Sequence, residues 1–250
     1  MQATISREDG VSLAFELLPG KEPVVVFLPG FASDMAGTKA VFLRDSCAAR
    51  GQAMMRLDYS GHGASGGRFE DGTIGEWTAD AAAVIAQAAP DVPLLLVGSS
   101  MGGWIALLLA RMLGGRVAAM LLIAPAPDFT QALIEAGLTA AQRAALDRDG
   151  FLAPPSEYGP PLPITKKLID EGRNHQLLGG PIPINCPVRI LHGMQDQDVP
   201  WQHSLKLVEG LASEDVRLIL VKDGGHRLSS DADLLLLSQT LFTLLGENGA

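Results

Sequence analysis

Three residue types that lie far apart in the chain could together activate a hydroxyl group. Ser100 is the central residue of 98–102, which read GSSMG and match the pattern G-x-S-x-G. A serine hydroxyl becomes a nucleophile when a base removes its proton, and the base needs a third group to fix its tautomer. The sequence offers His226 as the base, with Asp196 or Asp198 as the third group. The question is whether the surrounding elements would bring these residues together.

The residues around Ser100 have the pattern of a sharp turn between a strand and a helix. Residues 94–98 predict a strand buried on both faces, and residues 104–110 predict a buried helix. Such a turn strains its central residue and excludes bulky neighbours, which suits the two glycines of the pattern. It would expose Ser100 beside the unpaired N–H of Met101, at the amino end of the helix. We expect Ser100 to be a nucleophile, the alternative being a turn with only a packing role.

His226 is the strongest candidate for the base. It follows the predicted strand 216–221 in a loop that contains two glycines, and a parallel sheet presents its ligands at the carboxyl ends of its strands. We interpret the other histidines differently: His192 as a turn residue at the end of a strand, His175 and His203 as packed or solvated helix residues, and His62 as a weaker alternative base.

The third group would come from residues 193–200, which follow the predicted strand 187–191. Asp196 and Asp198 both lie in this stretch, and spacing alone does not decide between them. Aspartate also forms turns, so a purely structural role is the alternative for each.

Strand and helix signals alternate along most of the chain and predict a parallel sheet covered on both faces. The alternation is interrupted in the middle of the chain. We predict a core of residues 1–125 and 181–250, with residues 126–180 as a small cap over the carboxyl ends of the strands; the alternative is a disordered linker. The predicted parts of the cap are amphipathic segments at 129–138, 140–146 and 164–178, and an irregular stretch at 153–163 with five prolines in eleven residues.

Composition limits the classes of partner. The chain has 250 residues, a formal net charge of −9 and no basic run, so we expect neither nucleic acid nor an anionic membrane as a partner. No apolar run approaches the roughly 20 residues of a membrane span. Cys47 and Cys186 form no disulfide framework, and the first residues lack the features of a secretory signal or transit peptide. We expect a cytoplasmic protein, whose oligomeric state the sequence leaves open.

A glycine-rich loop gives a competing signal. Residues 61–66 read GHGASG and match G-x-G-x-x-G. A dinucleotide site would need these glycines to lead directly into an apolar helix, whereas residues 67–72 continue as a loop. No group of His, Cys and Asp has the sequence spacing of a metal site. We therefore predict neither a cofactor nor a metal.

The order Ser, Asp, His, with the motifs around these residues, resembles the α/β-hydrolase superfamily. The motifs are GSSMG at 98–102, HGxxDxxVP at 192–200 and Gly225-His226. The resemblance implies an α/β-hydrolase fold with a mostly parallel sheet of about eight strands and a small cap insertion. It also places the acid on Asp196, three residues before Val199.

The same resemblance implies an oxyanion hole built from two backbone amides. One is the N–H of Met101, and the other comes from the loop after the predicted strand 23–28. Many relatives carry His-Gly in that loop, whereas this chain has Pro-Gly-Phe at 29–31. Because the donor is a backbone group, its role survives this change, and Phe31 is our candidate.

Other stretches resemble one branch of abhydrolase-domain enzymes, described as palmitoyl-protein thioesterases and acyl-glucuronide esterases. They are residues 58–61, 97–104, 181–187 and 191–194. The branch implies a serine hydrolase that cleaves esters or thioesters through an acyl-enzyme, on a small-molecule or acylated-cysteine substrate. Trp104 and Arg227 are candidate substrate-binding residues; Arg227 could bind an anionic leaving group, or be a solvated surface residue. The alternatives are a general carboxylesterase or monoacylglycerol lipase-like enzyme, an aminopeptidase-like hydrolase, and a non-catalytic binding module on the same scaffold.

Overall fold

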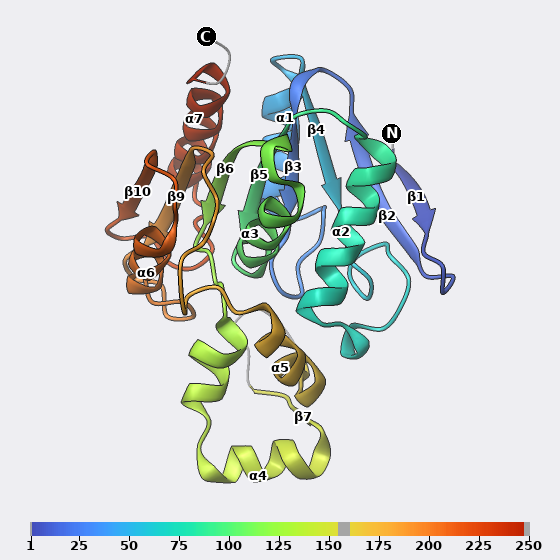
Figure 1. The fold of residues 1–250 in the computed structure, drawn as a ribbon, viewed down its shortest axis with the longest axis vertical. Coiled ribbons are helices and arrows are strands. Elements are labelled where there is room, and N and C mark those ends of the chain that lie inside the picture. The colour runs from blue at the N-terminus through green and yellow to red at the C-terminus, as the bar shows by residue number, and fades with distance from the viewer. Residues whose placement is uncertain (1, 155–160, 248–250) are drawn as a thin grey trace.

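In the computed structural model, residues 2–154 and 161–247 are described, and within them eight strands form one twisted sheet (Figure 1). The strand order is β1-β2-β4-β3-β5-β6-β9-β10; β2 runs antiparallel to both of its neighbours, and every other pair is parallel. The predicted fold class is therefore confirmed. The strands are β1 (Gln2–Ser6), β2 (Ser12–Leu18), β3 (Lys21–Leu28), β4 (Gln52–Leu57), β5 (Leu94–Ser99), β6 (Val117–Ile123), β9 (Val188–Gly193) and β10 (Val216–Val221).

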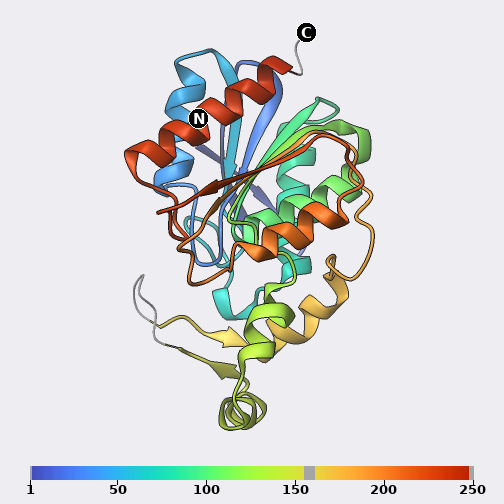
Figure 2. The same cartoon turned by 90° about the vertical axis from the view of Figure 1, so that its left-hand side faces the viewer.

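Helices cover both faces of this sheet (Figure 2). Helices α1 and α7 lie on one face, and α2, α3 and α6 lie on the other. The helices are α1 (Thr38–Ala48), α2 (Ile74–Ala88), α3 (Met101–Leu113), α6 (Gln202–Gly210) and α7 (Asp231–Glu247), with short 3-10 turns at Phe69–Asp71 (η1) and Gly114–Arg116 (η2).

The first four residues of β5 are all apolar, and their surroundings explain why. Leu94 and Leu96 belong to the hydrophobic cluster under α2 and α3, whereas Leu95 and Val97 belong to the cluster under α1 and α7. Successive side chains of a strand point to opposite faces, so a strand that is covered on both sides favours apolar residues at both sets of positions. Packing on both faces thereby fixes the strand at the centre of the molecule, and Ser100 directly follows its carboxyl end.

The chain between β6 and β9 extends beyond the carboxyl ends of the strands as a separate lobe (Figure 1). The predicted segment 129–138 contains a π-helix, and the segment 164–178 is helical only in part. Residues 155–160 of the proline-rich stretch lie outside the described residues, and the division into a core and a cap at 126–180 remains a prediction. The elements of this lobe are η3 (Thr130–Glu135), α4 (Ala140–Asp149), β7 (Phe151–Leu152), β8 (Ile164–Thr165), α5 (Lys166–Gly172) and η4 (Arg173–His175).

Asp128 joins the two ends of this lobe. Its buried carboxylate accepts hydrogen bonds from the amides of Leu177 and Leu178, each at 2.8 Å. Asp128 has a φ of 58°, a left-handed conformation that aspartate tolerates better than most residues. Burial raises the pKa of this carboxyl above its usual value, although the two amide donors oppose the shift. One side chain thus connects the beginning of the lobe to its end.

Candidate active site

Ser100 forms the turn between β5 and α3. Its φ is 53° and its ψ is −118°, a strained conformation for a residue that is not glycine. A Cβ placed on Gly98 would lie 2.4 Å from the carbonyl oxygen of Gly102, and one on Gly102 would lie 2.0 Å from that of Leu28. Both positions therefore require glycine. The turn is closed further by the Ser100 amide, which donates to the carbonyl of Ile123 at 2.9 Å.

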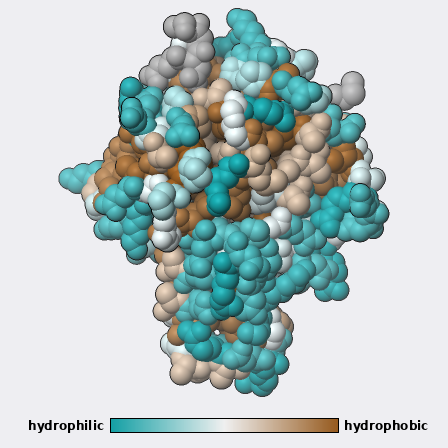
Figure 3. Space-filling view, viewed as in Figure 1, coloured by the Kyte–Doolittle hydropathy of each residue, from teal (hydrophilic) through white to brown (hydrophobic). Residues whose placement is uncertain are grey.

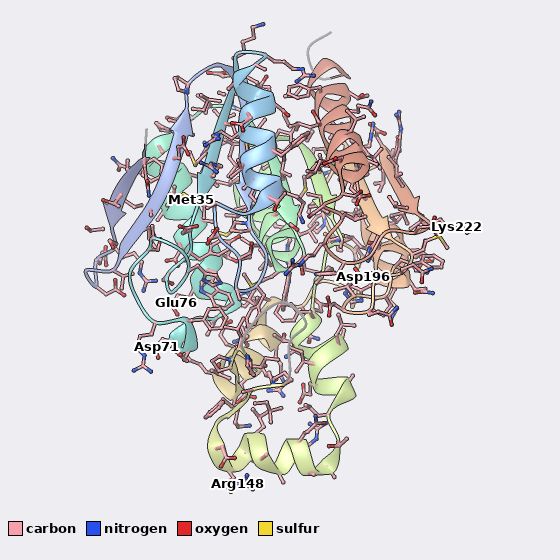
Figure 4. All side chains as sticks on the ribbon, turned by 180° about the vertical axis from the view of Figure 1, so that it is seen from behind. Met35, Asp71, Glu76, Arg148, Asp196 and Lys222 are labelled. Atoms are coloured by element: carbon pink, nitrogen blue, oxygen red, sulfur yellow. The ribbon has the colours of Figure 1, made fainter. Side chains whose placement is uncertain are left out.

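The structure brings Ser100, His226 and Asp196 into one chain of hydrogen bonds. Nε2 of His226 lies 3.0 Å from Oγ of Ser100, and Nδ1 of His226 lies 2.7 Å from Oδ2 of Asp196. The carboxylate can only accept, so Nδ1 carries the proton and Nε2 is free to accept one from the serine. His226 follows β10, Asp196 follows β9, and Ser100 follows β5, so all three meet at the carboxyl edge of the sheet. Figure 4 shows Asp196 at this edge, on the side that faces the lobe.

Asp196, rather than Asp198, occupies the acid position next to His226. The Asp196 side chain is fully buried, and its Oδ1 accepts hydrogen bonds from the amides of Asp198 (2.9 Å) and Val199 (2.8 Å). Burial alone would raise the pKa of Asp196, but hydrogen bonds from His192 and His226 outweigh it and hold the pKa well below the usual value. The carboxylate therefore stays ionised beside the imidazole.

His192 differs from its predicted place. It was expected to end a strand and to serve as a turn residue, but β9 continues to Gly193, so His192 is a fully buried strand residue. Its Nε2 lies 3.2 Å from Oδ2 of Asp196. The sequence held a signal for this, because Ile190 and Leu191 of β9 lead directly into His192, four residues before the acid.

Two backbone amides near Ser100 are the candidates for an oxyanion hole. A Cβ on Gly30 would lie 3.3 Å from Cβ of Ser100, so the loop after β3 passes directly beside the serine. Among the described residues, the amide of Phe31 in this loop has no hydrogen-bond acceptor. The amide of Met101 belongs to the first turn of α3, where no intrahelical acceptor exists. The Phe31 ring packs against Phe69, with ring centroids 4.9 Å apart.

The remaining candidate residues occupy different environments. Trp104 is fully buried in α3, and its indole N–H donates to the carbonyl of His175 at 3.0 Å, so it fastens the lobe to the core; its role in substrate binding stays a prediction. Arg227 is exposed next to His226. His62, the weaker alternative base, is buried between Phe69 and Trp77, whose ring centroids lie 5.0 and 5.1 Å from its own.

The glycine-rich loop at 61–66 is folded onto the protein itself. The Ala64 amide donates to the Asp58 carboxylate at 2.8 Å, and a Cβ on Gly63 would lie 2.2 Å from Oδ2 of the same aspartate. The loop runs on to η1 instead of opening a helix, so the context of a dinucleotide site is missing.

The fold also brings together a group that the sequence spacing did not predict. Ligand atoms of Asp196, Asp198 and His226 lie within 4.8 Å of one another, which a metal ion could in principle use. Two of the three are already hydrogen bonded to each other as a base and its acid. The arrangement as it stands can accept the Ser100 proton and stabilise the imidazolium that results.

Comparison with known proteins places the chain in a family. The family described as "Serine aminopeptidase, S33" matches residues 20–161. The chain belongs to this family of α/β-hydrolases, and it is an enzyme of the serine hydrolase class.

Its similarity to individual proteins covers nearly the whole chain. "Palmitoyl-protein thioesterase ABHD10, mitochondrial" from Pongo abelii is 39% identical over 248 residues, which span 96% of this chain and 79% of that protein. A putative hydrolase from Agrobacterium vitis S4 has a crystal structure with 45% identity and a TM-score of 0.92, over 98% of this chain and 97% of that one. The alpha/beta hydrolase domain-containing protein 10 from mouse is 37% identical with a TM-score of 0.90, over 99% of both chains.

Within the described residues, none of the helices has both the length and the apolar character needed to cross a membrane.

The contrast between Asp196 and Asp198 gives a direct test of the acid. Asp196→Asn should lower kcat by about 10⁴-fold, because the amide would leave the imidazole in the wrong tautomer. Asp198→Asn is the matched control, since it makes the same chemical change two residues away and should leave kcat close to wild type. Steady-state kinetics on a p-nitrophenyl ester measure both. Equal losses, or a larger loss in Asp198→Asn, would contradict the assignment.

Proposed function

We propose that this protein hydrolyses carboxylic esters or thioesters through an acyl-enzyme, with Ser100, His226 and Asp196 as its catalytic triad. The observation that carries the proposal is the continuous hydrogen-bond chain from Oγ of Ser100 through both ring nitrogens of His226 to Oδ2 of Asp196. In this chain His226 removes the serine proton as Oγ attacks the acyl carbonyl carbon. His226 then gives that proton to the leaving oxygen or sulfur.

The tetrahedral intermediate carries a negative charge on the former carbonyl oxygen. The amides of Phe31 and Met101 are the proposed donors to it, and the amino end of α3 adds a favourable dipole. Collapse of the intermediate leaves the acyl group on Ser100. Water, activated by His226, then attacks the acyl-enzyme and releases the carboxylic acid.

The proposed substrate is a thioester or ester with a fatty acyl chain, as in an acylated cysteine. The name of the Pongo abelii relative supports thioester chemistry. The lobe contains a pocket of about 390 Å³ with mainly apolar walls, which include Leu133, Ile134, Leu138 and Ile164. Leu133 and Ile134 also pack on the hydrophobic core cluster that includes Trp104, and Phe31 packs on the same cluster. In Figure 3 the visible face of the lobe is mostly hydrophilic, with some hydrophobic side chains around a small hollow near its lower end.

The alternative functions differ from this proposal in the bond that they would cleave. A carboxylesterase or monoacylglycerol lipase-like enzyme would favour oxyesters, an aminopeptidase-like enzyme would cleave amides, and a binding module would leave Ser100 inert. The net charge of −9 supports a substrate other than nucleic acid. A cytoplasmic location is part of the proposal, although the named relatives are described as mitochondrial.

The central test uses two adjacent serines of one motif. Ser100→Ala should lower kcat on the order of 10⁶-fold and abolish labelling by a fluorophosphonate, because the nucleophile is lost. Ser99→Ala is the matched control and should retain both. Rates on acyl thioesters, acyl glucuronides, p-nitrophenyl esters and amino-acid amides identify the leaving group. Wild-type protein that resists labelling would refute the proposal, and amides turned over faster than thioesters would favour the aminopeptidase-like alternative.

The lobe pocket can be tested as the acyl site by filling it. Leu138→Trp should lower kcat/KM for a sixteen-carbon acyl ester by about tenfold and leave an acetyl ester unchanged, since excluding two methylenes costs roughly 1.6 kcal/mol. Leu205→Trp, at an exposed position on α6, is the matched control. An equal decrease at every chain length would show that the pocket does not hold the acyl chain.

Arg227 tests whether the leaving group can be anionic, as in an acyl glucuronide. Arg227→Ala should raise KM for a substrate with a carboxylate in its leaving group and leave kcat/KM for a neutral aryl ester almost unchanged, because only the former has a charge to pair. Kinetics with the two substrates measure this. Equal losses on both substrates would rule out a role in charge recognition.

A further inference from the structure

A second histidine lies directly behind the acid of the triad. The imidazole of His192 is fully buried and contacts three groups. Its Nδ1 lies 2.7 Å from Oγ of Ser204, while its Nε2 lies 2.9 Å from the carbonyl oxygen of Val199 and 3.2 Å from Oδ2 of Asp196. His192 is on the opposite side of Asp196 from the reacting serine in this chain of contacts, so it has no direct contact with Ser100.

The contacts determine where the proton of His192 lies. A backbone carbonyl can only accept a hydrogen bond, so Nε2 carries a proton, which it shares between Val199 and Asp196. In the neutral imidazole Nδ1 then accepts a hydrogen bond from the Ser204 hydroxyl. Ser204 is fully buried in α6. The helix therefore holds the Ser204 hydroxyl in place, and this hydroxyl determines the tautomer of His192.

The Nε2–H group of His192 donates to both ends of the short turn 196–199, which begins with Asp196 and ends with Val199. Within this turn Oδ1 of Asp196 accepts the amides of Asp198 and Val199. His192 adds a donor to the other carboxylate oxygen, the one that faces His226. Without it, Oδ2 would lose a partner and the carboxylate could rotate about its bond to Cβ. The imidazole of His203 is a further titratable ring close to His192, and its Nε2–H donates to the carbonyl oxygen of Pro127 at 2.6 Å.

We propose that His192, with its tautomer set by Ser204, is a positioning residue that holds the Asp196 carboxylate in the plane required by His226. The inference rests on the proposed function, because it assigns His192 a role in the same reaction. His192 acts through Asp196 and touches neither the substrate nor the nucleophile. The catalytic unit therefore extends from Ser100 through His226, Asp196 and His192 to Ser204.

Two amide substitutions separate positioning from mere packing. Glutamine carries its amide nitrogen as many bonds from Cβ as Nε2 of histidine, so His192→Gln retains a donor for Asp196 and Val199. Asparagine reaches only as far as Nδ1, so His192→Asn removes that donor. His192→Asn should lower kcat on the order of 100-fold with KM nearly unchanged, as expected for a misplacement of about 1 Å, and His192→Gln should recover about tenfold of that loss.

Kinetics on a p-nitrophenyl ester and thermal unfolding of the same samples decide the outcome. A kcat for His192→Gln clearly above that for His192→Asn, with similar melting temperatures, supports the inference, and a smaller kcat decrease for Ser204→Ala supports the tautomer argument. Equal kcat values for the two His192 variants, or losses that only follow melting temperature, would overturn it. In either case wild-type turnover and fluorophosphonate labelling of Ser100 show separately whether the proposed function stands; if wild type is inert, both fail together.

Discussion

The close approach of three backbones at Ser100 is the constraint on which the rest of the site depends. The end of β3, the end of β5 and the beginning of α3 meet where no side chain fits, as the 2.0 Å separation between a hypothetical Gly102 Cβ and the Leu28 carbonyl oxygen shows. This contact sets the distance from the serine to the Phe31 loop. It also forces Ser100 into its left-handed φ, which projects the hydroxyl out of the sheet. The strain is held in place by β5 and α3, which are buried over most of their length.

Parallel strand topology explains how residues so distant in sequence become neighbours. Ser100 and His226 are 126 positions apart, yet Ser100 directly follows β5 and His226 lies in the loop after β10 of the same sheet. In parallel strands all carboxyl ends lie at one edge, so loops that follow different strands converge there without further instruction from the sequence. The buried strands fix the positions of the loops, and the loops carry the side chains that react. Mutations in the buried strands should therefore affect stability first, whereas mutations in the loops should affect activity.

Local signals made part of this site predictable. The apolar β5, the glycines around Ser100 and the loop after β10 all have short-range patterns, and the structure brings Ser100 and His226 together as those patterns suggested. Sequence spacing could not decide between Asp196 and Asp198, because both residues follow the same strand. They differ only in which carboxylate points into the protein. That depends on amides within the turn and on His192, whose burial in β9 is a tertiary property. The irregular lobe was predicted only in outline, since its π-helix has no distinct pattern.

The attachment of the lobe through Asp128 has a consequence for how such enzymes can diverge. Since one carboxylate binds the amides of Leu177 and Leu178, the two ends of the insertion are fixed to each other independently of what lies between them. Lengthening a closed loop costs little additional entropy, about 0.6 kcal/mol for each doubling. Evolution, or a protein engineer, could thus exchange the intervening helices for others of different length while the strands and their loops keep their geometry. Substrate range would then change by replacement of a module rather than by gradual adjustment of the reacting groups.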